Sequence, residues 1–181
     1  YVGQSGQEQS FTSAIDGVIR DLPDALTTIY ELHAQYKGYG LSLRGLWTEA
    51  FIDEAGNLSR TLDRGFTDPG DNGVRVLTDP RQSIARRMRG WYVEAAYDVM
   101  PLLKPGTRMS LEPYVRWEDY DTQNDVAGGF VEDQSKDIEL LVAGIQFKPI
   151  PQIVFKLDYR HFDPDGGDRA DEIQGLVGYV F

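Results

Sequence analysis

Strict alternation of apolar and polar side chains constrains this chain more than any other feature. A period of two places every second side chain on the same face of a β-strand. In the clearest run, residues 153–161, one face carries Ile153, Phe155, Leu157 and Tyr159 and the other carries Lys156, Asp158 and Arg160. Such runs occur at residues 28–36, 39–48, 91–99, 108–118, 137–147, 153–161 and 173–181. The sequence therefore predicts an all-β fold.

The connections between these runs alternate in length. Short turns fall at residues 37–38, 100–107 and 148–152, and longer polar loops fall at 53–87, 119–136 and 163–171. Short turns at one rim and long loops at the other are typical of an outer-membrane barrel. We therefore expect residues 26–181 to form about seven strands of a transmembrane, antiparallel up-and-down β-barrel. Residues 1–25 are expected to be an outer segment, in which 11–22 form a short helix.

Composition supports this interpretation by exclusion. The 181 residues carry a net charge of -11, which argues against nucleic acid as a partner because phosphates would repel most of the surface. No apolar run approaches the roughly 20 residues that a spanning helix needs. The absence of cysteine removes thiolate metal sites and cysteine nucleophiles. The acidity belongs to the outer segments, which leaves the strands and short turns nearly neutral.

The aromatic residues fall into two groups, one at each rim of the expected barrel. On the strand directions that the loop lengths imply, one set falls at the loop rim: Trp47, Trp91 and Trp117. A second set falls at the turn rim: Tyr36, Tyr97, Tyr179 and Phe181. Aromatic rings at two levels are typical of membrane-interface girdles. A soluble β core would also contain aromatic residues, but it would not explain why they sort by rim.

The polar positions of the strands are the candidate lining of a pore. They are Glu31, His33, Arg44, Glu94, Asp98, Glu112, Arg116, Glu118, Lys156, Asp158 and Arg160. In a wide barrel this mixed lining holds water and weakly selects the solutes that pass. The alternative is a narrow, closed barrel in which the same charges pair with one another to fill the interior.

Four segments resemble the C-terminal part of a Gram-negative outer-membrane porin, most closely the phosphate-selective (O/P-type) group. They are GWYVEAAY at 90–97, LEPYVRWE at 111–118, KLDYR at 156–160 and GYVF at 178–181. The resemblance covers roughly residues 26–181. One departure is Leu176, which stands where such a C-terminal strand usually has glycine.

The resemblance implies a water-filled channel in the outer membrane, without a cofactor or catalysis. The implied partners are outer-membrane lipid, lipopolysaccharide, the barrel-assembly machinery and two further copies in a homotrimer. Porins of this group resemble 16-stranded barrels, of which seven strands are fewer than half. Phosphate selectivity is not expected, because acidic residues outnumber basic ones among the candidate lining residues.

Seven strands leave open sheet edges whose backbone N–H and C=O groups cannot form hydrogen bonds with lipid. Each unpaired group costs several kcal/mol in hydrocarbon. Either residues before Thr28 supply an eighth strand, or the sequence lacks an N-terminal portion holding the remaining strands. We expect the second.

Other functions have weaker support. Asp163, Asp165 and Asp168 have oxygen ligands at spacings that suit calcium, although a solvated turn is the expected role of this loop. His33 and His161 are the only histidines, and neither lies in a recognisable motif with a serine, so no enzyme is expected. The alternatives are a small closed outer-membrane barrel with a structural, adhesive or enzymatic role, and a soluble lipocalin-like binder.

Overall fold

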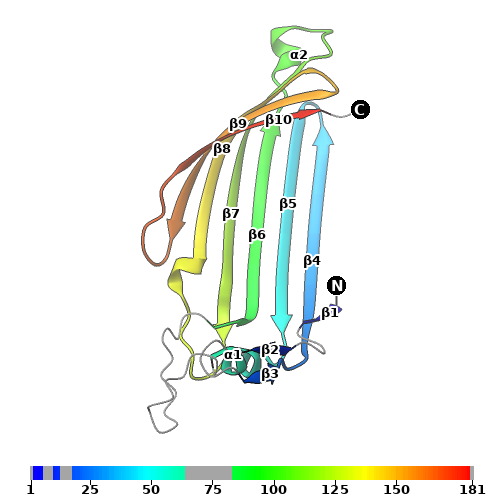
Figure 1. Cartoon of the computed structure of the whole chain (residues 1–181). Coiled ribbons are helices and arrows are strands. Elements are labelled where there is room, and N and C mark those ends of the chain that lie inside the picture. Colours follow the sequence, from blue (N-terminus) through cyan, green and yellow to red (C-terminus); the bar gives the residue numbers. More distant parts are fainter. Residues whose placement is uncertain (1, 6–9, 13–17, 64–82, 180–181) are drawn as a thin grey trace. The chain divides into compact units, whose positions relative to one another are not determined.

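The computed structural model describes residues 2–5, 10–12, 18–63 and 83–179. Its main element is one eight-stranded antiparallel sheet in which β4 to β10 follow one another up and down in chain order (Figure 1). The strands are β1 (Val2–Ser5), β4 (Ala25–Gly38), β5 (Leu41–Ile52), β6 (Ala85–Tyr97), β7 (Ser110–Val126), β8 (Asp137–Ile150), β9 (Ile153–Pro164) and β10 (Glu172–Tyr179). The expected all-β fold and each of the seven expected strands are confirmed.

The remaining elements are short. A separate two-stranded sheet joins β2 (Ser10–Thr12) to β3 (Ile19–Asp21). The helical segments are α1 (Ala55–Asp63), α2 (Met100–Leu103) and the 3₁₀ turn η2 (Gln134–Lys136). Among the residues described here, no helix has the length and apolar character to cross a membrane.

The expected helix at residues 11–22 is wrong where the structure describes this segment. Phe11 and Thr12 lie in β2, and residues 19–21 lie in β3. The apolar spacing that suggested a helix is too short to distinguish it from a strand. The β-branched side chains of Thr12, Val18 and Ile19, together with Gly17 in the sequence, favour extended backbone over helix.

Several loop boundaries also differ from expectation, among them the turn expected at 148–152, which is shorter because β8 continues to Ile150, and the loop expected at 163–171, which begins after Pro164. The first turn is Tyr39–Gly40 and not residues 37–38, because β4 continues to Gly38. The loop expected at 53–87 contains α1, and β6 already begins at Ala85. The loop expected at 119–136 begins later, since β7 continues to Val126. Polar residues in these strand ends hid the alternation, because charged side chains there occupy both faces.

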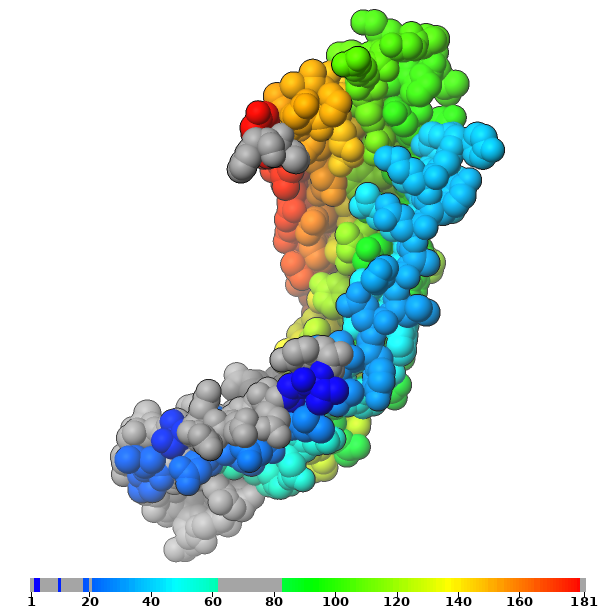
Figure 2. Space-filling model, turned by 90° about the vertical axis from the view of Figure 1, so that its right-hand side faces the viewer, coloured from blue at the N-terminus to red at the C-terminus, as the bar shows by residue number. Residues whose placement is uncertain are grey.

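An eighth strand comes from residues before Thr28, as the first of the two alternatives had it. β1 pairs with β4 from Val2↔Thr28 to Ser5↔Ala25. On the side of β4 away from β5, no described strand lies beside residues 31–38, which face the viewer in Figure 2. β10 forms the other edge and pairs with β9. In the described part of the chain, the sheet is therefore not closed.

The described residues form two compact units. One comprises those within 1–30, 48–89 and 121–137. One face of α1 is buried in this unit, where it contributes Ala55, Leu58 and Ser59. The Ser59 hydroxyl accepts a 2.9 Å hydrogen bond from the Ile84 N–H. The buried Gln123 carboxamide donates to the Ser83 carbonyl at 2.6 Å. These bonds fasten the helix and the loop ends of the strands within this unit.

The second unit comprises the described residues within 31–47, 90–120 and 138–181. It holds a buried cluster formed by Tyr114, Ile138, Leu140, Val142 and Phe162. All five side chains belong to one face of strands β7, β8 and β9. This face also carries most of the charged residues that the sequence selected as lining.

The turn between β4 and β5 holds a tyrosine in a backbone conformation that is unfavourable for it. Both of its central residues have positive φ, 52° at Tyr39 and 81° at Gly40, which is the type I′ geometry of a two-residue hairpin. Tyr39 is 97% exposed, so its ring contributes no packing. We expect Tyr39→Asn to stabilise the protein by about 0.5–1 kcal/mol, because asparagine tolerates positive φ better. Urea-dependent unfolding in detergent measures the change, and Tyr39→Val should instead destabilise.

Candidate functional site: the polar face of the sheet

In the second unit one side of the sheet carries large exposed apolar side chains, and the other side carries most of the charged side chains, several of them sheltered. Along β4, β9 and β10, Leu32 is 70% exposed, Leu157 is 55% exposed and Val177 is 71% exposed. On the opposite face Asp158 is only 5% exposed. A soluble protein distributes these residue types the other way round. We call the two sides the apolar face and the polar face.

Ion pairs connect the strands of the polar face. Arg44 on β5 lies 3.6 Å from Glu94 on β6, and Lys148 on β8 lies 3.9 Å from Glu112 on β7. Glu112 also accepts hydrogen bonds from Ser110 at 2.7 Å and from Gln146 at 3.0 Å. Each carboxylate on this part of the face therefore has a cation or a neutral donor beside it.

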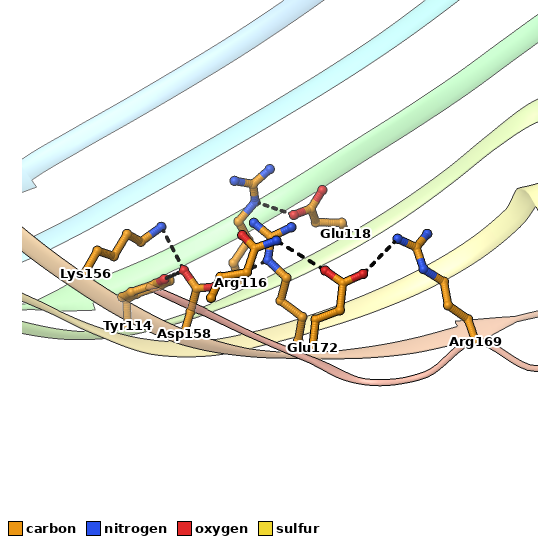
Figure 3. A network of polar contacts seen from close by, with 9 residues as sticks. Tyr114, Arg116, Glu118, Lys156, Asp158, Arg169 and Glu172 are labelled. Atoms are coloured by element: carbon orange, nitrogen blue, oxygen red, sulfur yellow. Dashed lines mark hydrogen bonds and ion pairs between the residues drawn. The ribbon is translucent and has the colours of Figure 1, made fainter. Parts of the chain in front are cut away.

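The centre of the polar face is the carboxylate of Asp158. It accepts a 2.7 Å hydrogen bond from the Tyr114 hydroxyl, and Lys156 Nζ and Arg160 Nε each lie 3.4 Å away. Figure 3 shows Tyr114, Lys156 and Asp158 on the same side of the sheet as Arg116 and Glu118, which form a 2.9 Å ion pair. One carboxylate thus receives a hydroxyl and two cations from two strands.

Cations also lie over aromatic rings on this face. Lys156 Nζ is 4.5 Å from the centre of the Tyr114 ring, and the Arg116 guanidinium is 4.0 Å from that of Tyr92. Arg169, from the loop before β10, lies 3.7 Å from the Phe162 ring and 3.4 Å from Glu172. These contacts hold long cationic side chains against the sheet, where they remain partly accessible to water.

The structure brings together most, but not all, of the candidate lining residues. Arg44, Glu94, Glu112, Arg116, Glu118, Lys156, Asp158 and Arg160 take part in the pairs above. Glu31 and His33 lie exposed on the edge strand β4, where they pair with each other at 3.2 Å. Asp98 lies beyond the end of β6, and its carboxylate accepts from the backbone N–H groups of Met100 and Leu111 at 3.0 and 3.1 Å. Asp98 therefore caps a turn.

Sequence reasoning missed Tyr114, Gly144 and Lys148. Tyr114 and Lys148 follow the same alternation as the selected residues, so the period of two was enough to find them. Gly144 matters because a Cβ there would lie only 2.6 Å from the Tyr114 hydroxyl oxygen. Its absent side chain leaves the space that the Tyr114 ring occupies. No pattern in the sequence marks this pairing.

The aromatic residues of the two expected girdles lie on the apolar face. Trp91 and Trp117 pack edge to face with their ring centres 5.3 Å apart. Trp47, Tyr36, Tyr97 and Tyr179 are all exposed. Phe181 lies outside the described residues. The tryptophan pair agrees with the expectation that Trp91 and Trp117 lie at one level of the sheet.

Polar side chains border the apolar face at the loop end of its strands. Along β8 the residue that precedes Leu141 on this face is Glu139, and along β9 His161 follows Tyr159. Asp171 lies beside the end of β9, where it accepts hydrogen bonds from the Tyr159 hydroxyl and pairs with His161 Nδ1 at 2.8 Å. The Tyr159 bond, followed by that of His161, lowers the pKa of the Asp171 carboxyl below its usual value. The carboxylate therefore keeps its charge at this border.

The candidate calcium ligands are not gathered at one point. Asp163 lies within β9 opposite Glu139, whereas Asp165 and Asp168 lie in the loop that follows. In the parts of the chain that the structure describes, no group of three or more His, Asp or Glu side chains is placed to hold a metal ion.

Comparisons with known proteins place the chain beside one relative. No protein-family model matches it, and no solved structure matches it. An uncharacterized protein of Aquifex aeolicus (strain VF5) is 26% identical over 171 residues, which is 92% of this chain. The matched stretch spans 36% of the relative's length. The chain is therefore similar, over nearly its whole length, to about a third of a longer bacterial protein.

Proposed function

We propose that this chain forms part of an outer-membrane porin, a water-filled β-barrel channel for passive diffusion of small hydrophilic solutes or ions. The observation that carries the proposal is the inverted sheet, which exposes large apolar side chains and shelters charged ones. Lipid is the environment in which this distribution is favourable, because each large apolar side chain buried gains roughly 1.5–3 kcal/mol. The polar face then borders water inside the barrel.

The strand lengths support this proposal. A transmembrane β-strand needs about 9–11 residues at a tilt of about 45°. β4, β6 and β8 have 14, 13 and 14 residues, and β7 has 17. Each of these strands is long enough to cross the hydrocarbon layer and to extend beyond it at the loop end.

The open edges favour a barrel larger than these eight strands. β4 and β10 present backbone N–H and C=O groups that lipid cannot satisfy, so each edge needs a further strand. The relative from Aquifex aeolicus extends well beyond the stretch that aligns with this chain, which leaves room for such strands. A 16-stranded, trimeric porin in the outer membrane, folded by the barrel-assembly machinery and in contact with lipopolysaccharide, is the arrangement that we propose.

Conductance in a planar lipid bilayer tests the proposal. The detergent-solubilised full-length protein, with the strands that close the barrel, should produce stable, stepwise openings, because the lining charges hold a continuous column of water. A folded protein that enters the bilayer without conducting would favour the small closed barrel. A protein that folds and stays monomeric in water without detergent would contradict both membrane arrangements.

Ion selectivity should follow the charges of the polar face. In the double variant Lys156→Gln/Arg160→Gln, Asp158 keeps its carboxylate and loses both cations, so the lining becomes more negative. We expect the cation-to-anion permeability ratio to rise roughly two-fold or more. The reversal potential in a potassium chloride gradient measures this ratio. Lys104→Gln, in the exposed turn after α2, is the matched control and should leave the ratio unchanged.

A further inference from the structure

An apolar groove of about 760 Å³ crosses the apolar face of the second unit from β5 to β9. Its lining includes the small side chain of Ala95, with larger apolar neighbours Leu43, Val115 and Trp117 around it. The volume lies within the roughly 300–1,000 Å³ that small-molecule sites in proteins occupy. The groove is thus large enough for part of one amphiphilic molecule and too small for a packed protein element.

The groove ends at two carboxylates. Glu139 on β8 and Asp163 on β9 line it and are direct partners in the register of the two strands. Like charges directly opposite each other destabilise a sheet. Arg44 and Glu94 also border the groove, but their side chains belong to the polar face, where they pair with each other at 3.6 Å. Within the described structure, no ion pair joins either Glu139 or Asp163 to a cation.

His161 does not supply the missing positive charge. It lines the same end of the groove, next to Asp163 along β9, but its Nδ1 is directed to Asp171 at 2.8 Å. A positively charged group bound between Glu139 and Asp163 would relieve their repulsion, whereas a phosphate there would add to it. The charge of this end therefore selects a cation.

We infer that the groove binds one acyl lipid whose head group carries a primary ammonium. The acyl chain lies along Leu43, Ala95 and Val115, and the ammonium lies between Glu139 and Asp163. This inference rests on the proposed function, because it places the apolar face in a membrane. The joint presence of an apolar groove and a carboxylate pair at its end fits an amphiphile better than a hydrocarbon alone.

Tryptophan quenching tests the inference, since Trp117 lines the groove and Trp47 lies on the same face outside it. The full protein is reconstituted in phosphatidylcholine vesicles that contain a small fraction of bromine-labelled phosphatidylethanolamine or bromine-labelled phosphatidylglycerol with the same chains. Trp47→Phe/Trp91→Phe leaves Trp117 as the sole reporter, and Trp91→Phe/Trp117→Phe leaves Trp47. We expect the ethanolamine lipid to quench Trp117 roughly two-fold more strongly than the glycerol lipid, and Trp47 to show no preference.

Substitutions in the groove separate a bound lipid from the general lipid layer. Ala95→Leu fills the floor and should abolish the preference, whereas Ala143→Leu, an exposed alanine on the same face outside the groove, should preserve it. Glu139→Gln/Asp163→Asn should also abolish the preference, because it removes the charge that selects ammonium. Quenching of Trp117 that depends on neither head group nor Ala95 overturns the lipid site and leaves the membrane proposal standing. Absence of quenching at both tryptophans overturns the two together.

Discussion

Replacing Gly144 with alanine is expected to destabilise the protein by about 2–4 kcal/mol. The new Cβ would lie 2.6 Å from the hydroxyl oxygen of Tyr114 and 2.7 Å from a ring carbon. The ring cannot stay where it is, so its 2.7 Å hydrogen bond to Asp158 is lost. Overpacking costs about 1–3 kcal/mol, and a sheltered carboxylate that loses a donor costs a similar amount. Urea-dependent unfolding in detergent measures the loss.

The control substitution is expected to stabilise the protein, whereas Gly144→Ala destabilises it. Gly175 also lies within a strand, but no atom outside its neighbours lies within 4 Å of a Cβ built there. Gly175→Ala should therefore stabilise by up to about 0.5–1 kcal/mol, because alanine loses less backbone entropy than glycine. In a Tyr114→Ala background, Gly144→Ala should cost almost nothing. If Gly144→Ala keeps its full cost without the Tyr114 ring, steric exclusion of that ring is not the cause.

Replacing Asp158 with asparagine is expected to cost about 2–3 kcal/mol and to change the ion selectivity of the proposed channel. The substitution keeps the shape of the side chain but leaves Lys156 and Arg160 without their shared carboxylate. Removing one member of a sheltered ion pair is strongly destabilising because the remaining charge is uncompensated. The two uncompensated cations should also shift the reversal potential toward anion selectivity.

Two variants make this result interpretable. Asp165→Asn removes the same charge from an exposed loop position, and we expect it to change stability by less than about 0.5 kcal/mol. Tyr114→Phe removes only the hydroxyl and should cost about 1–2 kcal/mol without a change of selectivity. A selectivity change as large in Asp165→Asn as in Asp158→Asn would show that the polar face does not control permeation.

The strands could be predicted because alternation is a local property of the chain. In the middle of β9, from Lys156 to Arg160, every second residue is charged, so the residue type alone assigns each side chain to a face. The pattern fails at the start of β6 and the end of β7, where both faces meet water. Charged residues occur there on both faces, so apolar and polar residues no longer alternate. It also failed at Tyr39, since a turn that places a tyrosine at positive φ contradicts the usual preference for glycine or asparagine.

The sequence was enough to predict which charged residues belong to the candidate site. It was not enough to predict which residues of neighbouring strands contact one another there. Alternation selected Lys156, Asp158 and Arg160 together, and the structure joins them at 3.4 Å. The meeting of Tyr114 with Gly144 depends on the register between two strands, and register is set by contacts along their whole length. Asp98 was assigned to the lining because a residue just beyond the end of a strand still fits the period of two. Its carboxylate instead accepts hydrogen bonds from backbone N–H groups of the turn that follows.

Pairing between chain neighbours has a consequence for how this sheet forms. From β5 to β10 every strand lies beside the strand that precedes it in the sequence, and two residues suffice to connect β4 to β5. Most of these connections are short, and loop-closure entropy grows only slowly with length even for the long connection between β5 and β6, so the entropic cost of each step is small. The sheet can grow one hairpin at a time from any starting pair. In the barrel that we propose, the step that depends on distant parts of the polypeptide is the last one, in which the edges at β4 and β10 meet their partners.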